Sequence, residues 1–295
     1  MTLCSRLASV LFASLVLVPG RSAAQPGPPA QAKCDQACLT GVMDDFVRSM
    51  TAARTTPPLT DSAEIRENAA LVRLEQTTWT RVKAVRSILT FADELTGNVV
   101  SRAGVELSDG KPAYLSTRLK VTSDRRITDV EISADTSSRV VSAYVWSLDP
   151  MLMRVLPPAE RLDRVALEAL ARRYFNSLSS HQAVAADFDE SCNRFHSGQQ
   201  ITNVARNTVE AGAPRTCVGS LEGNPPWGPA TDQRFPVVDP DRGIVFGVTL
   251  LHYLKGPLPS QMYVSELFKV VSGRIVRIDN IGLMMQGTKT LGFAH

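Results

Sequence analysis

A chain of 295 residues is longer than the roughly 100 to 200 residues of a typical single domain, which favours two compact domains. The apolar fraction of 44% and the charged fraction of 21% lie near globular averages, which argues against a disordered, fibrous or membrane-embedded protein. A net charge of +3 is too small to indicate a nucleic-acid-binding protein, so nucleic acid is not expected as a partner.

Residues 1–24 have the pattern of a cleavable secretory signal peptide. Arg6 precedes an apolar run from Leu7 to Val18, and the small residues Ser22, Ala23 and Ala24 follow. The run is shorter than the roughly 20 apolar residues that a spanning helix needs, so a permanent membrane anchor is the less favoured alternative. We therefore predict cleavage after Ala24 and a soluble product, secreted or periplasmic, without a membrane partner.

Removing the signal peptide leaves the four cysteines Cys34, Cys38, Cys192 and Cys217. An even number in an oxidising compartment favours disulfides over free thiols. Four cysteines allow three pairings, and the short sequence separations favour Cys34–Cys38 together with Cys192–Cys217. The alternative is a zinc site, which is less favoured because no histidine lies near the first pair. No metal is expected.

The rest of the chain is predicted to form two similar units. Residues 25–33 are rich in proline, glycine and alanine and are expected to be a disordered leader. A first α+β unit is predicted over residues 34–149. Paired prolines then mark a linker over residues 150–162, and a second α+β unit is predicted over residues 163–295.

The two units are predicted to be distant repeats of each other. The apolar spacing of a helix over Leu39–Met50 matches that of a helix over Leu167–Leu178. Near the end of each unit, a strand, a turn and a second strand follow one another, over Tyr114–Glu131 and over Tyr263–Asp279. The same element order at both places indicates a tandem repeat.

A long helix before antiparallel strands predicts an α+β fold, in which a curved antiparallel sheet wraps around N-terminal helices as a cone. The chain resembles the nuclear transport factor 2-like superfamily, whose SnoaL-like members share this order. It resembles more closely a family of exported proteins of unknown function with two such units. The segments that carry this resemblance are Cys34–Leu39, Leu156–Arg161, Arg234–Asp239 and Glu266–Val270.

The resemblance covers nearly the whole mature chain. It implies a fold but does not imply a particular reaction or ligand. The superfamily holds isomerases, dehydratases, cyclases and plain binding modules. Pairing through sheet faces is common for this fold. With two units in one chain, we expect this pairing to form internally, as a pseudo-dimer within a monomer.

Two strands of the second unit carry polar residues on apolar faces. His252 lies among apolar residues in Ile244–Leu254, and Glu266 does so in Met262–Val270. The two strands are predicted to pair as a hairpin with a long loop. A carboxylate and an imidazole on one apolar face would shift each other's pKa, as general acid–base catalysis near neutral pH requires. The alternative is a buried polar pair that only satisfies its own hydrogen bonds.

Four other residues are candidates for ligand binding: Asp232, Arg234, Trp227 and Tyr174. Asp232 and Arg234 precede a predicted strand, where they could lie at a pocket mouth or form a surface pair. Trp227 stands in a proline-rich loop that could cover a ligand or the edge of a core. Tyr174 lies on a helix, where an aromatic residue usually belongs to the core. His196 is predicted to be an exposed loop residue without a role.

These residues suggest two alternative functions for the protein, both located in the second unit. Thr117 occupies the position that matches Glu266, and the first unit has no histidine, so an acid–base site would belong to the second unit. We favour an exported protein that binds a small organic ligand in the second unit. The alternative is a cofactor-independent lyase or isomerase with Glu266 and His252 as acid and base. The chain has no nucleotide-binding, zinc-protease or serine-hydrolase motif, and no cofactor is expected.

Overall fold

The structure is a computed structural model that describes residues 33–53, 55–204, 216–222, 227–254, 260–287 and 290–293. The predicted signal peptide, all of the predicted leader except Lys33, and the loop between the two strands of the predicted His252–Glu266 hairpin lie outside the described residues.

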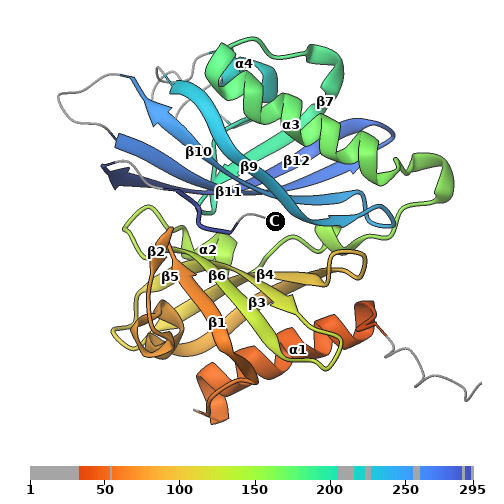
Figure 1. The fold of residues 1–295 in the computed structure, drawn as a ribbon. Helices are drawn as coiled ribbons and strands as arrows, with labels where there is room; N and C mark the ends of the chain where they lie inside the picture. The colour runs from red at the N-terminus through yellow and green to blue at the C-terminus, as the bar shows by residue number, and fades with distance from the viewer. Residues whose placement is uncertain are drawn as a thin grey trace, which may run out of the picture. The chain divides into compact units, whose positions relative to one another are not determined.

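The fold is mixed α+β with two six-stranded sheets (Figure 1). The first sheet has the order β2-β1-β6-β5-β4-β3. Its strands are β1 (Leu59–Glu67), β2 (Ala70–Leu71), β3 (Val82–Asp93), β4 (Asn98–Leu107), β5 (Pro112–Val121) and β6 (Ile127–Asp135).

The second sheet has the order β8-β7-β12-β11-β10-β9, which is the first order with six added to each number. Its strands are β7 (Phe188–His196), β8 (Gln199–Gln200), β9 (Trp227–Asp239), β10 (Ile244–Tyr253), β11 (Ser260–Val271) and β12 (Arg274–Gln286). The predicted hairpins are confirmed, because β5 pairs with β6, β11 with β12 and β10 with β11, each antiparallel.

Neither sheet is wholly antiparallel, and the prediction is wrong on this point. β1 pairs with β6 in parallel, and β7 pairs with β12 in parallel. Parallel neighbours need a long connection, and the other four strands of the sheet separate β1 from β6 along the chain.

A long helix covers one face of each sheet. Helix α1 (Gln36–Arg48) starts at Asp35, whose carboxylate accepts a hydrogen bond from the Cys38 amide at 2.8 Å. It continues as a π-helical turn, η1 (Ser49–Ala53). Its buried residues recur at helical spacing and pack on the first sheet. They are Leu39, Val42, Met43 and Phe46.

Helix α3 (Arg164–Ser180) covers the second sheet in the same way (Figure 1). Asp163 caps its start by accepting a hydrogen bond from the Ala166 amide at 2.8 Å. Tyr174 and Phe175 point into the core between this helix and the second sheet.

The remaining helical elements are short and lie in the connections. They are η2 (Leu74–Gln76), η3 (Thr78–Arg81), α2 (Ser142–Val145), η4 (Pro150–Met153), η5 (Pro158–Glu160), η6 (Ala185–Asp187) and α4 (Cys217–Glu222). In the part of the chain that the structure describes, no helix has the length and hydropathy that crossing a bilayer requires.

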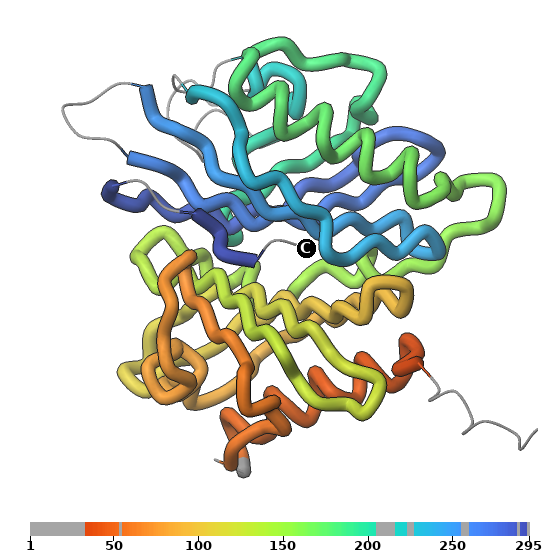
Figure 2. Tube along the Cα trace, viewed as in Figure 1, coloured from red at the N-terminus to blue at the C-terminus, as the bar shows by residue number. Residues whose placement is uncertain are grey.

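The two sheets face each other within one compact unit, residues 32–295. Figure 2 shows this along the Cα trace, with the first sheet in orange to yellow-green and the second in bluish green to blue. A shared apolar cluster includes residues of both sheets. Among its members are Phe91 and Val100 from the first sheet, with Val237, Phe246, Tyr263 and Leu267 from the second.

Two hydrogen bonds cross between the sheets in a reciprocal pattern. The Tyr114 hydroxyl donates to Asp279 at 2.9 Å, and the Tyr263 hydroxyl donates to Glu131 at 3.4 Å. Tyr114 matches Tyr263 in the aligned repeats, and Glu131 matches Asp279. The two halves of the chain therefore correspond in these contacts as well as in the order of their strands.

Both predicted disulfides are confirmed, Cys34–Cys38 at the start of α1 and Cys192–Cys217 between β7 and α4. We expect loss of Cys192–Cys217, in a Cys192→Ser/Cys217→Ser variant, to lower the free energy of unfolding by roughly 3 kcal/mol, because its residues are 25 positions apart. Loss of Cys34–Cys38, with a separation of 4, should cost only about 2 kcal/mol. Urea denaturation measures both, and the reverse ranking would contradict this account.

Candidate functional site

The predicted acid–base pair does not form, because His252 and Glu266 lie on opposite faces of the second sheet. In the β10–β11 ladder, Glu266 is opposite Gly247 and His252 is opposite Gln261. Directly opposite residues share a face, and faces alternate along each strand. His252 lies five positions from Gly247 along β10, and this odd separation places it on the opposite face of the sheet. The two positions are also about 17 Å apart along the strand, at ~3.4 Å per residue.

His252 has a different environment from Glu266. It is half-buried, and its Nε2 lies 3.0 Å from the Thr231 hydroxyl. The apolar residues that share its face, Val248 and Leu250, belong to the cluster between the sheets. His252 therefore does not face the core beneath α3.

Glu266 is fully buried on the face of the second sheet that packs against α3. Its Oε1 accepts hydrogen bonds from the Tyr174 hydroxyl and from the Asn280 side-chain amide, each at 3.0 Å. A guanidinium nitrogen of Arg194 lies 3.9 Å from the same oxygen. Oε2 has no hydrogen-bond partner among the described residues. We call Tyr174, Arg194, Glu266 and Asn280 the polar cluster.

Burial dominates the proton affinities in the polar cluster. Loss of water raises the pKa of Glu266 above 4.5, although the charge of Arg194 and the hydrogen bonds from Tyr174 and Asn280 act against it. Burial likewise raises the pKa of Tyr174 well above 10.0. The cluster therefore favours a neutral carboxyl and a neutral phenol.

His196 lies beside the cluster, and its prediction as an exposed loop residue is wrong. It is the last residue of β7, opposite Asn280, with its Nε2 3.3 Å from the Gly282 carbonyl oxygen. Burial lowers its pKa to about 4, so it is neutral at physiological pH. Its place at a strand end, followed by a tight Ser197–Gly198 turn, explains why the sequence resembles a loop.

The polar cluster of the second half has no counterpart at the matching positions of the first half. Equivalent positions follow from the aligned helices and strands and from the registers of β1 with β6 and β7 with β12. The four polar residues, with their first-half counterparts, are Tyr174 (Phe46), Arg194 (Ile65), Glu266 (Thr117) and Asn280 (Ile132).

The first-half positions form an ordinary core. Phe46 packs edge-to-face on Trp79, whose indole N–H donates to the Thr117 hydroxyl at 2.8 Å. Ile65 and Ile132 belong to the same apolar cluster. At these four positions the first half is thus filled without an ion, and packing alone does not require the polar cluster.

Sequence analysis identified two cluster members and missed Arg194 and Asn280. The available signal was the repeat alignment itself, extended by one residue. Asp279 matches Glu131, so Asn280 matches Ile132, a polar residue where the other copy is apolar. Arg194 gave no such signal, because β7 and β1 cannot be aligned without their registers.

The candidate ligand-binding residues lie in separate places. Tyr174 belongs to the polar cluster, whereas Trp227 is the first residue of β9 and packs edge-to-face on Tyr253 at 5.3 Å. Asp232 and Arg234 line one cavity of about 340 Å³ but do not pair with each other. Asp232 accepts a hydrogen bond from a backbone amide, and Arg234 donates to a buried carboxylate.

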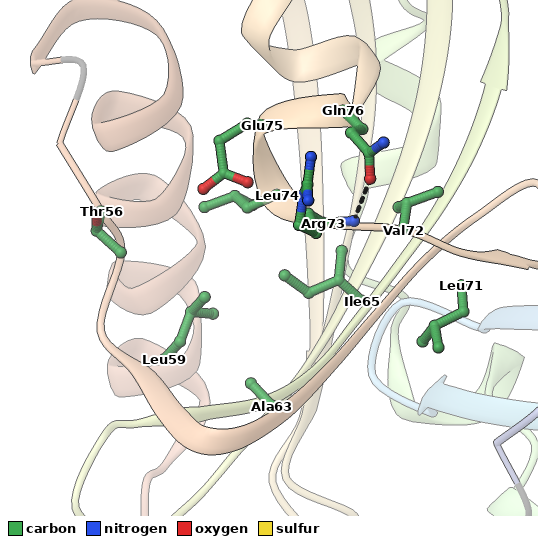
Figure 3. Close-up of a pocket in the computed structure, with 10 residues that line it drawn as sticks. All are labelled: Thr56, Leu59, Ala63, Ile65, Leu71, Val72, Arg73, Leu74, Glu75 and Gln76. Atoms are coloured by element: carbon green, nitrogen blue, oxygen red, sulfur yellow. Dashed lines mark hydrogen bonds between the residues drawn. The ribbon is translucent and has the colours of Figure 1, made fainter.

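The largest of five prominent cavities lies in the first half, which sequence analysis left without a site. It is an open groove of about 540 Å³ beside β1, with an apolar wall and a polar end (Figure 3). The polar end is Arg73, Glu75 and Gln76, where the Arg73 amide donates to the Gln76 side chain at 2.9 Å. Glu266 lines none of the five cavities.

Metal-ligating side chains do not gather in the described ranges: no group of three or more His, Cys, Asp or Glu residues there could hold a metal ion.

Comparisons with known proteins match part of the second half to a family model. Residues 160–282 match a family model described as "Domain of unknown function (DUF8021)". A solved structure of a candidate ketosteroid isomerase from Kribbella flavida DSM 17836 is similar at 16% identity, over 43% of this chain and 84% of that chain, with a TM-score of 0.30. No curated protein matches the chain.

Proposed function

We propose that this protein is an exported binding protein that holds a small organic molecule against the polar cluster of its second half. The observation that carries the proposal is the asymmetry between the repeats. Four equivalent positions are polar in one copy and are apolar or a hydroxyl-bearing threonine in the other. Burying a polar oxygen without a partner costs about 1 to 3 kcal/mol, so the unpartnered Oε2 of Glu266 lowers the stability of the fold.

The chemistry of the cluster indicates the kind of ligand. Glu266 Oε2 is the free hydrogen-bonding position, and a carboxyl with a raised pKa can donate or accept there. The surroundings are aromatic, since Tyr174 packs on Phe268 at 5.0 Å and Phe175 packs on Phe268 at 5.7 Å. We therefore propose an apolar molecule with one polar group. Because Glu266 is fully buried, the aromatic side chains around it must move apart when the ligand binds.

The finer architecture belongs to the same proposal. We propose that each sheet curves around its helix as a cone, that residues 1–24 direct export, and that the mature chain is a monomer with an internal pseudo-dimer. Two disulfides are compatible with an oxidising compartment. The reciprocal Tyr114–Asp279 and Tyr263–Glu131 contacts support the pseudo-dimer.

A screen of small organic molecules by thermal shift tests the binding proposal. We expect at least one compound to stabilise the wild-type protein and to lose about tenfold or more in affinity in Glu266→Gln, because one hydrogen bond to a buried carboxyl contributes about 1.5 kcal/mol. Glu131→Gln is the matched control, since Glu131 is also buried but lies between the sheets. Equal losses in both variants would overturn the assignment to Glu266.

A second candidate function rests on the raised pKa of Glu266, which suits a general acid. In this form the protein is a cofactor-independent lyase or isomerase that acts on the bound molecule, with Glu266 and without His252. Turnover of a ligand found by the screen, lost in Glu266→Gln while binding of the ligand's apolar part remains, would favour this candidate over binding alone.

A further inference from the structure

Three arginines converge on one aromatic ring at the boundary between the sheets. The guanidinium carbon of Arg118 lies 4.6 Å from the centre of the Phe293 ring, and those of Arg66 and Arg234 each lie 5.8 Å from it. Arg66 and Arg118 belong to the first sheet and Arg234 to the second. The ring is nearly buried, at 7% exposed, so these contacts lie away from solvent.

Carboxylates balance the charge of the arginines. Arg118 donates to Glu131 at 2.8 Å and Arg234 donates to the same carboxylate at 2.7 Å. Arg118 also donates to Asn98 at 2.9 Å and to Asp129 at 3.3 Å. The charges of Arg118 and Arg234 are therefore already paired, and an anion would gain little here.

Arg66 also has a carboxylate partner, and the backbone at Gly292 packs closely against its guanidinium group. It donates to Glu64. Gly292 has φ +88°, and a Cβ there would lie 2.1 Å from the Arg66 guanidinium carbon, so no other residue fits without a shift. The preceding Leu291 is 1% exposed, and its amide donates to Asp232 at 3.2 Å.

The Phe293 ring leaves part of the hydrogen-bonding capacity of the arginines unused. Arg118 Nη2 and Arg234 Nε are buried and have no hydrogen-bond partner among the described residues. A phenyl ring can accept such N–H groups only weakly through its face. A cavity of about 340 Å³ adjoins the ring, lined by Asp232, Gln233, Arg234 and Thr290–Phe293.

We propose that Arg66, Arg118 and Arg234 form a binding pocket for an uncharged aromatic carbonyl compound, and that Phe293 occupies this pocket as an internal ligand. The guanidinium faces hold the ring, as they hold Phe293. The carbonyl oxygen accepts from the two unpartnered N–H groups, which a phenylalanine cannot do. The balanced charges select a neutral ligand. This pocket is separate from the polar cluster.

The test replaces the internal ligand by a free one. In Phe293→Ala, benzamide should raise the melting temperature and bind about tenfold more tightly than cyclohexanecarboxamide, which has the same amide without the ring. The matched control is Phe91→Ala, another buried ring, over which no described guanidinium lies. There benzamide should have no greater effect than cyclohexanecarboxamide.

Equal binding of the two amides in Phe293→Ala, or equal rescue of Phe91→Ala, would overturn the proposal, because it would reduce the pocket to an ordinary cavity. Phe293→Leu covers the case in which the alanine variant does not fold, since leucine keeps part of the packing and leaves more of the guanidinium faces open than phenylalanine does. Benzamide should then bind Phe293→Leu more tightly than wild type, and equal binding again counts against the pocket. Loss of ligand binding in Glu266→Gln leaves this result unaffected.

Discussion

Replacing Glu131 with alanine is expected to lower the free energy of unfolding by about 3 to 5 kcal/mol. Glu131 is buried between Arg118 and Arg234, which donate to it at 2.8 and 2.7 Å, and the Tyr263 hydroxyl donates from the other sheet at 3.4 Å. Without the carboxylate, the guanidinium groups of Arg118 and Arg234 remain buried close together and lose the negative charge that both of them share. Urea denaturation at neutral pH gives the difference.

The pH dependence identifies the charge as the cause. Burial raises the pKa of Glu131, but the charges and hydrogen bonds of Arg118 and Arg234 outweigh it, so the pKa lies below 4.5 in the folded protein. A lowered folded pKa stabilises the fold above pH 4.5, and this contribution is lost as pH falls through the folded pKa. Glu131→Ala should lose less stability than wild type on acidification through that range.

The control for this prediction is Asp45→Ala. Asp45 pairs with Arg48 at 2.9 Å, but its side chain is 45% exposed, so its loss should cost under about 1 kcal/mol. A cost for Glu131→Ala no larger than that for Asp45→Ala would show that the pairs between the sheets contribute little, and would remove the main polar link between the two halves.

The elements of this fold could be predicted because their patterns are local. The helix that bears Tyr174 and the hairpin that bears Glu266 appear as apolar periodicity and alternation, and the repeat alignment locates their first-half counterparts. The parallel β1–β6 and β7–β12 pairs could not be predicted in this way, because a contact between distant strands leaves no mark on the periodicity of either strand.

The geometry of the candidate site also depends on contacts between strands, and the sequence did not predict it. His252 and Glu266 each lie on an apolar face, but each such face belongs to a different core, one between the sheets and one beneath α3. Both β10 faces are buried, so burial could not tell them apart. Only the register decides, and in this ladder every pair joins an even-numbered residue to an odd-numbered one. An even-numbered residue of β10, such as His252, and an even-numbered residue of β11, such as Glu266, therefore never share a face.

Glu266→Gln is expected to be more stable than the wild-type protein at neutral pH, with an advantage that disappears in acid. Burial is the largest cause of the raised pKa of Glu266, and the nearby Arg194 only partly offsets it. Because the folded protein then binds this proton more tightly than the unfolded chain does, the contribution of Glu266 is full below pH 4.5. It is lost as pH rises through the folded pKa, at about 1.4 kcal/mol for each unit by which the pKa is raised.

Glutamine cannot ionise and keeps an acceptor for the hydrogen bonds of Tyr174 and Asn280. The difference in unfolding free energy between variant and wild type should therefore grow from pH 4.5 upward and become constant above the folded pKa. Glu131→Gln should show the opposite trend, because the pKa of Glu131 is lowered. If the Glu266→Gln and wild-type curves instead run parallel, Glu266 folds as a carboxylate matched by Arg194, and a proton donor to a ligand would have to be found elsewhere.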